Sequence, residues 1–133
     1  MREMAELKYR DGFHGTYEVG GQTLKIGMDA IRPYDMTYGA VASCMWATYL
    51  DVTKKKEVSV QGADVSISGF KRKAIPATLE RVVIHVTVYS KEPLEKLQEC
   101  MDLAIKYCSM VQTVAKVAAI EYDIQKSEEE PHA

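Results

Sequence analysis

Polar and apolar residues alternate along the first part of the chain in three short runs. The runs are Leu7–Arg10, Phe13–Val19 and Thr23–Gly27. Asp11-Gly12 and Gly20-Gly21 separate them, and such dipeptides are typical of tight turns between antiparallel strands. The pattern therefore predicts an antiparallel meander of three strands.

A helical pattern follows from Pro33 to about Lys55. Proline suits the first position of a helix, and an acidic residue such as Asp35 favours the helix start. One predicted helix face carries Val41, Cys44, Met45, Thr48, Tyr49 and Val52, and the opposite side carries Ala40, Ala42, Trp46, Ala47 and Leu50. A helix that is apolar nearly all round is a buried helix. Because the chain is small, we expect a second subunit to bury the part of this helix that one chain leaves exposed.

Two more alternating stretches predict a second group of strands. The first covers Val58–Gly69, with Gln61–Asp64 as a bulge or a turn within it. The second, Leu79–Tyr89, gives the clearest strand signal in the chain. One of its faces carries Val82, Ile84, Val86 and Val88.

The last third of the sequence predicts two helices and a closing strand. Ser90 is the candidate N-cap of the first helix, with Pro93 in its first turn and an end near Cys108. Its apolar stripe consists of Leu94, Leu97, Met101, Ala104 and Ile105. A shorter helix over Ser109–Val117 and a strand over Val117–Ile124 follow. Hairpin strands and grouped helices predict an α+β fold in one domain, residues 1–133, with 128–133 as a flexible tail.

Composition and charge exclude several classes of protein. The 133 residues are 47% hydrophobic and 27% charged, with a formal net charge of -2, as in an ordinary globular domain. A nucleic-acid binder needs clustered Lys and Arg, so we expect no nucleic-acid partner. No apolar run approaches the roughly 20 residues of a membrane span, and the first residues carry no signal-like run. We therefore expect a cytoplasmic protein with no membrane partner.

Three cysteines, Cys44, Cys100 and Cys108, leave three interpretations open: buried apolar residues, metal ligands or redox groups. The chain has no CxxC motif and no histidine at ligand spacing from a cysteine, so a metal site is not predicted. Cys100 precedes Cys108 by about 12 Å of helix rise, which indicates a packing role. If Cys108 begins a helix, the helix start favours its thiolate.

Two segments around cysteines carry a resemblance to a known family. Pro33–Cys44 combines a proline, an acid, a run of small and apolar residues and a cysteine, and Tyr107–Val114 contains the second cysteine. Both segments, in this order and at this spacing, resemble the OsmC / organic hydroperoxide resistance (Ohr) family. The resemblance covers nearly the whole chain, from about residue 5 to 124.

The resemblance implies an OsmC-like α+β fold in an intertwined homodimer with active sites between the subunits. It also implies a thiol peroxidase for oxidative-stress defence, with an organic hydroperoxide as substrate and no cofactor. Cys44 would be the peroxidatic nucleophile and Cys108 the resolving thiol, and a dithiol reductant would reset their disulfide. Met45, Trp46 and Tyr38 would line the substrate pocket, although Trp46 also suits an ordinary core position.

The sequence departs from the family at the residues that support the thiolate. The family uses an arginine and a glutamate, whereas the acidic candidate here is Asp35, preceded by Tyr34. The basic candidates are Lys25 and Arg32, with Arg10 more remote. The family's second cysteine is commonly followed by proline, and this chain has Ser109 instead. The alternative function is therefore a weakly active or non-enzymatic dimer that binds an apolar small molecule at the subunit interface.

Overall fold

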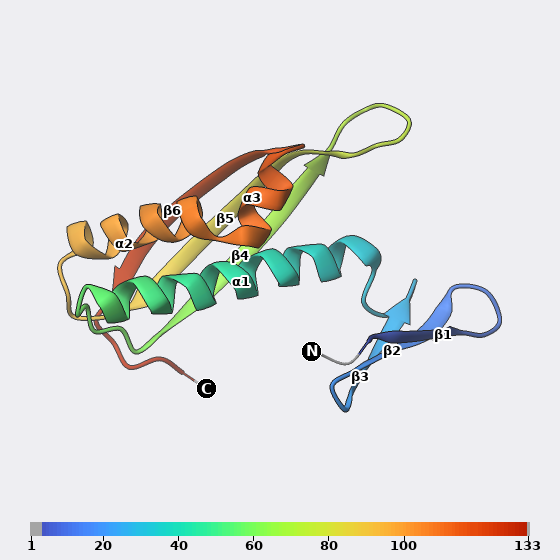
Figure 1. The fold of residues 1–133 in the computed structure, drawn as a ribbon, viewed down its shortest axis with the longest axis horizontal. Helices are drawn as coiled ribbons and strands as arrows, with labels where there is room; N and C mark the ends of the chain where they lie inside the picture. The colour runs from blue at the N-terminus through green and yellow to red at the C-terminus, as the bar shows by residue number, and fades with distance from the viewer. Residues whose placement is uncertain (1–3, 133) are drawn as a thin grey trace. The chain divides into compact units, whose positions relative to one another are not determined.

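The N-terminal part of the chain is a three-stranded antiparallel sheet. A computed structural model describes residues 4–132, and its contacts divide the chain after Gly39 into two compact units. In the first unit, the strands β1 (Glu6–Tyr9), β2 (His14–Val19) and β3 (Gln22–Gly27) pair in the order β1-β2-β3 (Figure 1). Gly20 and Gly21 turn the chain with positive φ angles, which glycine adopts without strain. The predicted meander is confirmed.

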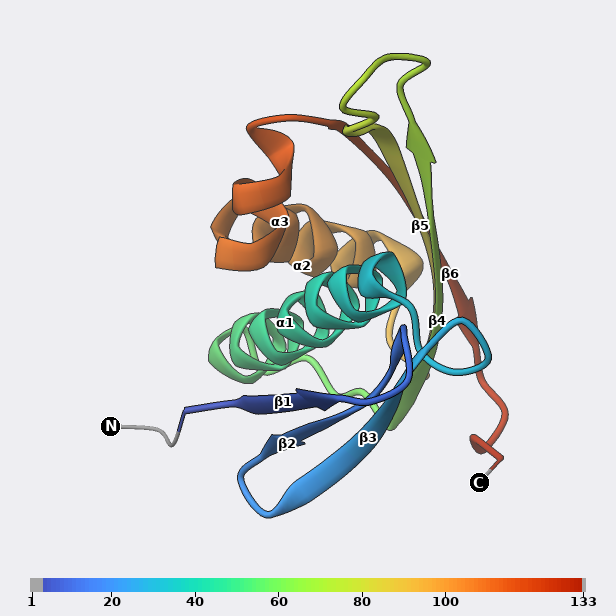
Figure 2. The same ribbon diagram turned by 90° about the vertical axis from the view of Figure 1, so that its right-hand side faces the viewer.

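The second unit consists of three helices on a second sheet. The helix α1 (Pro33–Lys55) begins in the first unit, and most of it belongs to the second; α2 (Leu94–Tyr107) and α3 (Ser109–Ala115) follow later. The sheet pairs β4 (Gly62–Lys71), β5 (Leu79–Tyr89) and β6 (Ala119–Ser127) in the order β4-β5-β6. Figure 2 shows the helices of this unit on the same face of the sheet. The predicted α+β class is confirmed.

The strand β6 corrects the expectation that the strands pair only as hairpins. β4 and β5 form an antiparallel hairpin, but β6 lies parallel to β5. Two parallel neighbours need a long connection between them, which α2 and α3 supply by crossing one face of the sheet. This crossover also brings the junction of α2 and α3 to the side of the sheet that α1 covers (Figure 2).

The core lies between this sheet and its helices. β5 contributes the predicted face, which is buried throughout: Val82, Ile84, Val86 and Val88. Leu97, Met101 and Ala104 of α2 are also fully buried, as is Val111 of α3. Tyr49 of α1 is fully buried, and its hydroxyl donates to the carbonyl of Leu97 at 3.1 Å, which joins α1 to α2.

Within one chain, α1 is buried along a single stripe only. The stripe consists of Val41, Met45, Tyr49 and Thr53, at intervals of four residues. Ala40, Ala47 and Leu50 on the remaining surface are exposed. The predicted burial on all sides is therefore not achieved by one chain, because the second unit covers one side of the helix. Cover by a second subunit stays a prediction.

Several predicted boundaries are wrong for local reasons. β4 starts at Gly62 rather than Val58, and its register shift lies between Phe70 and Lys71 rather than at Gln61–Asp64. Ser90 is not the N-cap of α2, because its hydroxyl instead donates to the carbonyl of Ser59 at 2.7 Å and accepts from the N–H of Glu92.

The end of the chain also differs from its predicted bounds. α3 ends at Ala115 rather than Val117, and β6 starts at Ala119 and continues to Ser127 rather than Ile124. β6 is longer than predicted because Ser127 still pairs with Tyr89, the last residue of β5. Among the described residues, no helix is long and apolar enough to cross a membrane.

Candidate functional site

Cys44 and Cys108 meet in the second unit. Cys44 lies in α1 and is half-buried, whereas Cys108 lies between α2 and α3 and is fully buried. Both are free thiols and lie close enough for each to shift the pKa of the other, and Ser109, the residue next to Cys108, has its Oγ atom 3.7 Å from Cys44 Sγ. The predicted proximity of these two cysteines is confirmed.

Cys108 separates two helices. Its extended backbone, with φ -71° and ψ 118°, interrupts the helical path, and its N–H donates to the carbonyl of Ala104 at 2.8 Å to close α2. Its Sγ atom accepts the N–H of Val111 at 3.5 Å, which caps the start of α3. The same residue therefore ends one helix, starts the next and holds its sulfur in a fixed position.

Hydrogen bonds lower the pKa of the Cys44 thiol below its ordinary value. The largest contribution comes from the backbone N–H of Met110 and the next from the side chain of Cys108. Burial opposes both with a smaller effect, and Ser109 and Thr48 lower the pKa by less again. The Oγ atom of Ser109 lies 3.7 Å from Cys44 Sγ. Donors of this kind stabilise the negatively charged form of a thiol.

The pKa of Cys108 is shifted in the opposite direction. Burial is the largest cause and raises the pKa of the Cys108 thiol. The adjacent Cys44 raises this pKa further, and the backbone N–H of Val111 lowers it. The expectation that a helix start favours the thiolate of Cys108 is therefore wrong, because desolvation outweighs the helix start. The site pairs a half-buried thiol whose pKa is lowered with a fully buried thiol whose pKa is raised.

Cys100, the third cysteine, lies in the core. Its side chain is fully buried in α2, and burial raises the pKa of its thiol. Both properties suppress thiolate reactivity, as the packing role predicted for it requires.

The residues predicted to line the substrate pocket have different surroundings. Met45 is fully buried and contributes to the core rather than to an open pocket. Trp46 is half-buried and stacks on Tyr49 with the ring centroids 5.2 Å apart. Tyr38 belongs to the first unit, where its ring lies 6.2 Å from that of Tyr34.

The predicted thiolate-supporting residues Lys25, Arg32 and Asp35 also belong to the first unit. The Asp35 carboxylate accepts the backbone N–H of Arg32 at 2.9 Å, a contact that caps the start of α1. The Arg32 guanidinium donates to the carbonyl of Met28 at 3.4 Å. The action of these three residues on Cys44 stays a prediction.

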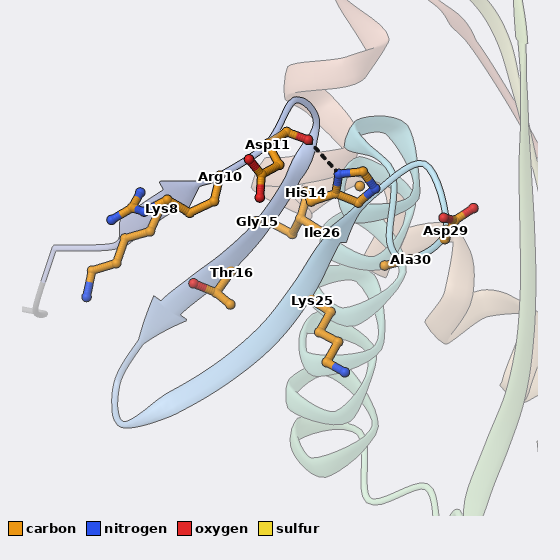
Figure 3. Close-up of a pocket in the computed structure, with 11 residues that line it drawn as sticks. Lys8, Arg10, Asp11, His14, Gly15, Thr16, Lys25, Ile26, Asp29 and Ala30 are labelled. Carbon is orange, nitrogen blue, oxygen red and sulfur yellow. Dashed lines mark hydrogen bonds between the residues drawn. The ribbon is translucent and has the colours of Figure 1, made fainter.

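Lys25 lines a cavity of about 780 Å³ on the meander (Figure 3). Lys8 and Thr16 lie beside it on the neighbouring strands, in register with one another. His14 and Asp11 lie at the rim, where the ring Nδ1 of His14 donates to the Asp11 carbonyl at 3.0 Å. Cationic and acidic side chains are mixed on this surface.

A histidine of β5 is paired with a carboxylate. His85 is exposed, and its Nδ1 lies 2.5 Å from a carboxylate oxygen of Asp123, its neighbour on β6. Within residues 4–132, no three His, Cys, Asp or Glu side chains are grouped so that they could hold a metal ion.

Sequence reasoning missed the donors that act on Cys44. Nothing in the sequence indicated that Met110 and Thr48 would lower the pKa of Cys44, because Met110 acts through its backbone and Thr48 is an ordinary helix residue. Ser109 was visible only as a departure from the family pattern. The predicted helix break at Cys108 was the available sign that free N–H groups would gather there.

Comparison with known proteins identifies relatives of this fold. A family model described as OsmC-like protein matches residues 26–123. The crystal structure of an OsmC-like protein from Mycoplasma pneumoniae superposes with a TM-score of 0.82 at 13% identity, covering 96% of this chain and 100% of that chain. The crystal structure of a hypothetical protein from Aquifex aeolicus superposes with a TM-score of 0.80 at 20% identity, covering 96% of this chain and 98% of that chain.

A third solved structure is the organic hydroperoxide resistance protein OhrB of Bacillus subtilis. Its TM-score is 0.69 at 17% identity, with 92% of this chain and 98% of that chain covered. At these identities the structures establish a shared fold. No curated protein is similar enough in sequence to count as a relative of the chain.

Proposed function

The chain belongs to the OsmC-like protein family, and from that premise we propose that it is a thiol peroxidase that reduces organic hydroperoxides. The observation that carries the proposal is the contact between an accessible Cys44, whose pKa is lowered, and a buried Cys108, whose pKa is raised. The fold is shared with proteins named for organic hydroperoxide resistance, which supports the same substrate class.

Cys44 carries out the first step. Its thiolate attacks the distal oxygen of the hydroperoxide, so that an S–O bond forms and the O–O bond breaks. The alkoxide leaves and takes a proton from water to become an alcohol. Cys44 is oxidised to a sulfenic acid, and the hydroperoxide is reduced by two electrons. The half-buried position of Cys44 gives the substrate access to its sulfur.

Cys108 carries out the second step. It loses its proton and attacks the Cys44 sulfur, so that an S–S bond forms while the S–O bond breaks and hydroxide leaves. The two cysteines are neighbours before the reaction, because Ser109, which directly follows Cys108, has its Oγ atom 3.7 Å from Cys44 Sγ. An external dithiol then reduces the disulfide, restores both thiols and becomes a disulfide itself. This cycle needs a reducing compartment, so we expect the protein to act in the cytoplasm.

The intact protein should form the disulfide when it receives one equivalent of cumene hydroperoxide. The expected product is a loss of about two mass units, confined to a linked pair of peptides that contain Cys44 and Cys108. The peptide that contains Cys100 serves as the internal control and should keep its free thiol. Oxidation of Cys100 alone, or an unchanged Cys44, would contradict the proposed chemistry.

We further propose that the functional form is a homodimer. Its support is the apolar surface that one chain leaves exposed, on α1 and on the meander: Ala40, Ala47, Leu50, Leu7, Tyr9 and Leu24. Exposed apolar surface of this kind is typical of subunit interfaces. Size-exclusion chromatography with light scattering should give about twice the chain mass of 14.9 kDa. A mass of one chain at micromolar concentration would exclude the dimer.

A further inference from the structure

Ser109 places a hydroxyl beside the sulfur of Cys44. It is the first residue of α3 and directly follows Cys108, so the helix break that fixes Cys108 also fixes Ser109. Its Oγ atom lies 3.7 Å from Cys44 Sγ, within hydrogen-bonding range for sulfur. Its backbone carbonyl accepts the hydroxyl of Thr113 at 2.8 Å, which holds the first turn of α3 in place.

The direction of this hydrogen bond depends on the charge of the sulfur. When Cys44 is a neutral thiol, either atom can donate. A thiolate has no proton and can only accept, so the hydroxyl must then donate. Since hydrogen bonds to charged groups are stronger than those between neutral groups, the Ser109 contact strengthens on ionisation.

We propose that Ser109 is a catalytic residue of this site, whose hydroxyl donates to the Cys44 sulfur and holds it as the attacking thiolate. The inference rests on the proposed peroxidase function, in which Cys44 is the nucleophile. It also assigns a role to the residue at which this chain departs from the family's proline. Proline has no hydroxyl to offer, so this contact is a property of the present sequence.

The other groups around Cys44 support the same role. Cys108 is the titratable group that faces it, and burial keeps this thiol protonated and able to donate. Met110 offers a backbone N–H and Ser109 a hydroxyl, whereas the hydroxyl of Thr48 donates to the backbone carbonyl of Cys44 at 2.9 Å. All these donors are uncharged, so the thiolate is held by hydrogen bonds that salt screens little. Ser109 is the exposed member of the set.

The matched variants for the test are Ser109→Ala, which removes the hydroxyl, and Ser109→Thr, which keeps it. Ser68→Ala, at an exposed position of β4, makes the same chemical change far from the site in sequence and serves as the control. The rate of iodoacetamide alkylation at Cys44 is followed against pH by peptide mass spectrometry. The midpoint of that profile reports the ionisation of Cys44 in the whole protein and needs no peroxide.

Ser109→Ala should raise the midpoint by about one pH unit, which leaves about tenfold less thiolate at neutral pH. Ser109→Thr and Ser68→Ala should both keep the wild-type profile. A residue that only helps α3 to start would change thermal unfolding without moving the midpoint, so an unchanged profile in Ser109→Ala overturns the inference. An equal shift in Ser109→Thr also overturns it, since the hydroxyl would then be irrelevant.

Turnover of cumene hydroperoxide separates this inference from the function on which it rests. If the wild-type protein consumes the hydroperoxide and Ser109→Ala slows the reaction in proportion to the lost thiolate, both stand. If the midpoint shifts as expected but the wild-type protein consumes no hydroperoxide, the hydroxyl still holds the thiolate and the peroxidase proposal fails. If turnover is intact and Ser109→Ala is as fast as wild type, the assignment of Ser109 fails alone.

Discussion

Cys44→Ser is expected to abolish the consumption of organic hydroperoxide. A serine hydroxyl stays protonated at neutral pH, and the donors around Cys44 cannot make it a comparable nucleophile. The rate should fall by at least about a thousandfold, to the background of the uncatalysed reaction. Loss of cumene hydroperoxide in the presence of excess dithiol is the direct measurement.

Cys108→Ser should separate the two steps of the proposed cycle. The hydroperoxide should still oxidise Cys44, but the sulfenic acid then has no partner thiol beside it. The protein should consume about one equivalent rapidly and accumulate a sulfenic acid, which a dimedone probe traps. Rapid, repeated turnover in this variant would show that Cys108 does not resolve the intermediate.

Cys100→Ala is the control for both variants. Cys100 is buried in α2 and outside the proposed chemistry, so turnover per folded chain should match wild type. If instead Cys44→Ser consumes hydroperoxide as fast as wild type, the peroxidase proposal fails. The remaining function would then be the alternative of a dimer that binds an apolar small molecule, and the two cysteines would show the alkylation kinetics of ordinary thiols.

The bounds of a helix or strand could be predicted from the sequence where the same chain buries one of its faces, because the apolar residues then repeat at regular intervals. β5 shows this directly: its alternation predicted both its bounds and its buried face, and the structure agrees at each end. β6 was placed less well, since its length is set by pairing with β5 rather than by its own residues. Its parallel direction follows from the crossover of α2 and α3, which no local pattern encodes.

The candidate site was predictable to a smaller extent. Nothing in the spacing of Cys44 and Cys108 requires contact, and it was the family resemblance that predicted it. The opposite pKa shifts depend on burial and on hydrogen bonds across the fold, which sequence patterns do not contain. Ser109 is the clearest case: it was visible in the sequence as a departure, but its contact with Cys44 exists only because α1 packs beside the start of α3.

Ile84→Ala is expected to destabilise the protein by about 3–4 kcal/mol. Ile84 is fully buried on the helix-covered face of β5, the central strand of its sheet. Removal of its outer carbons loses buried apolar contacts and leaves a cavity that neighbours on two strands and the helices cannot fill. Urea unfolding followed by circular dichroism should therefore show a lower midpoint at an unchanged slope.

Ile75→Ala removes the same atoms from a side chain that is fully exposed in the loop between β4 and β5. Its effect should stay within about 0.5 kcal/mol, because an exposed side chain loses little on truncation. Protein concentration must be equal in both experiments, since dimerisation would add a concentration-dependent contribution. An equal effect of the two substitutions would contradict the assignment of the core to this face of β5. Since α1 and the α2–α3 junction rest on that face, it would also remove the physical basis for the meeting of Cys44 and Cys108.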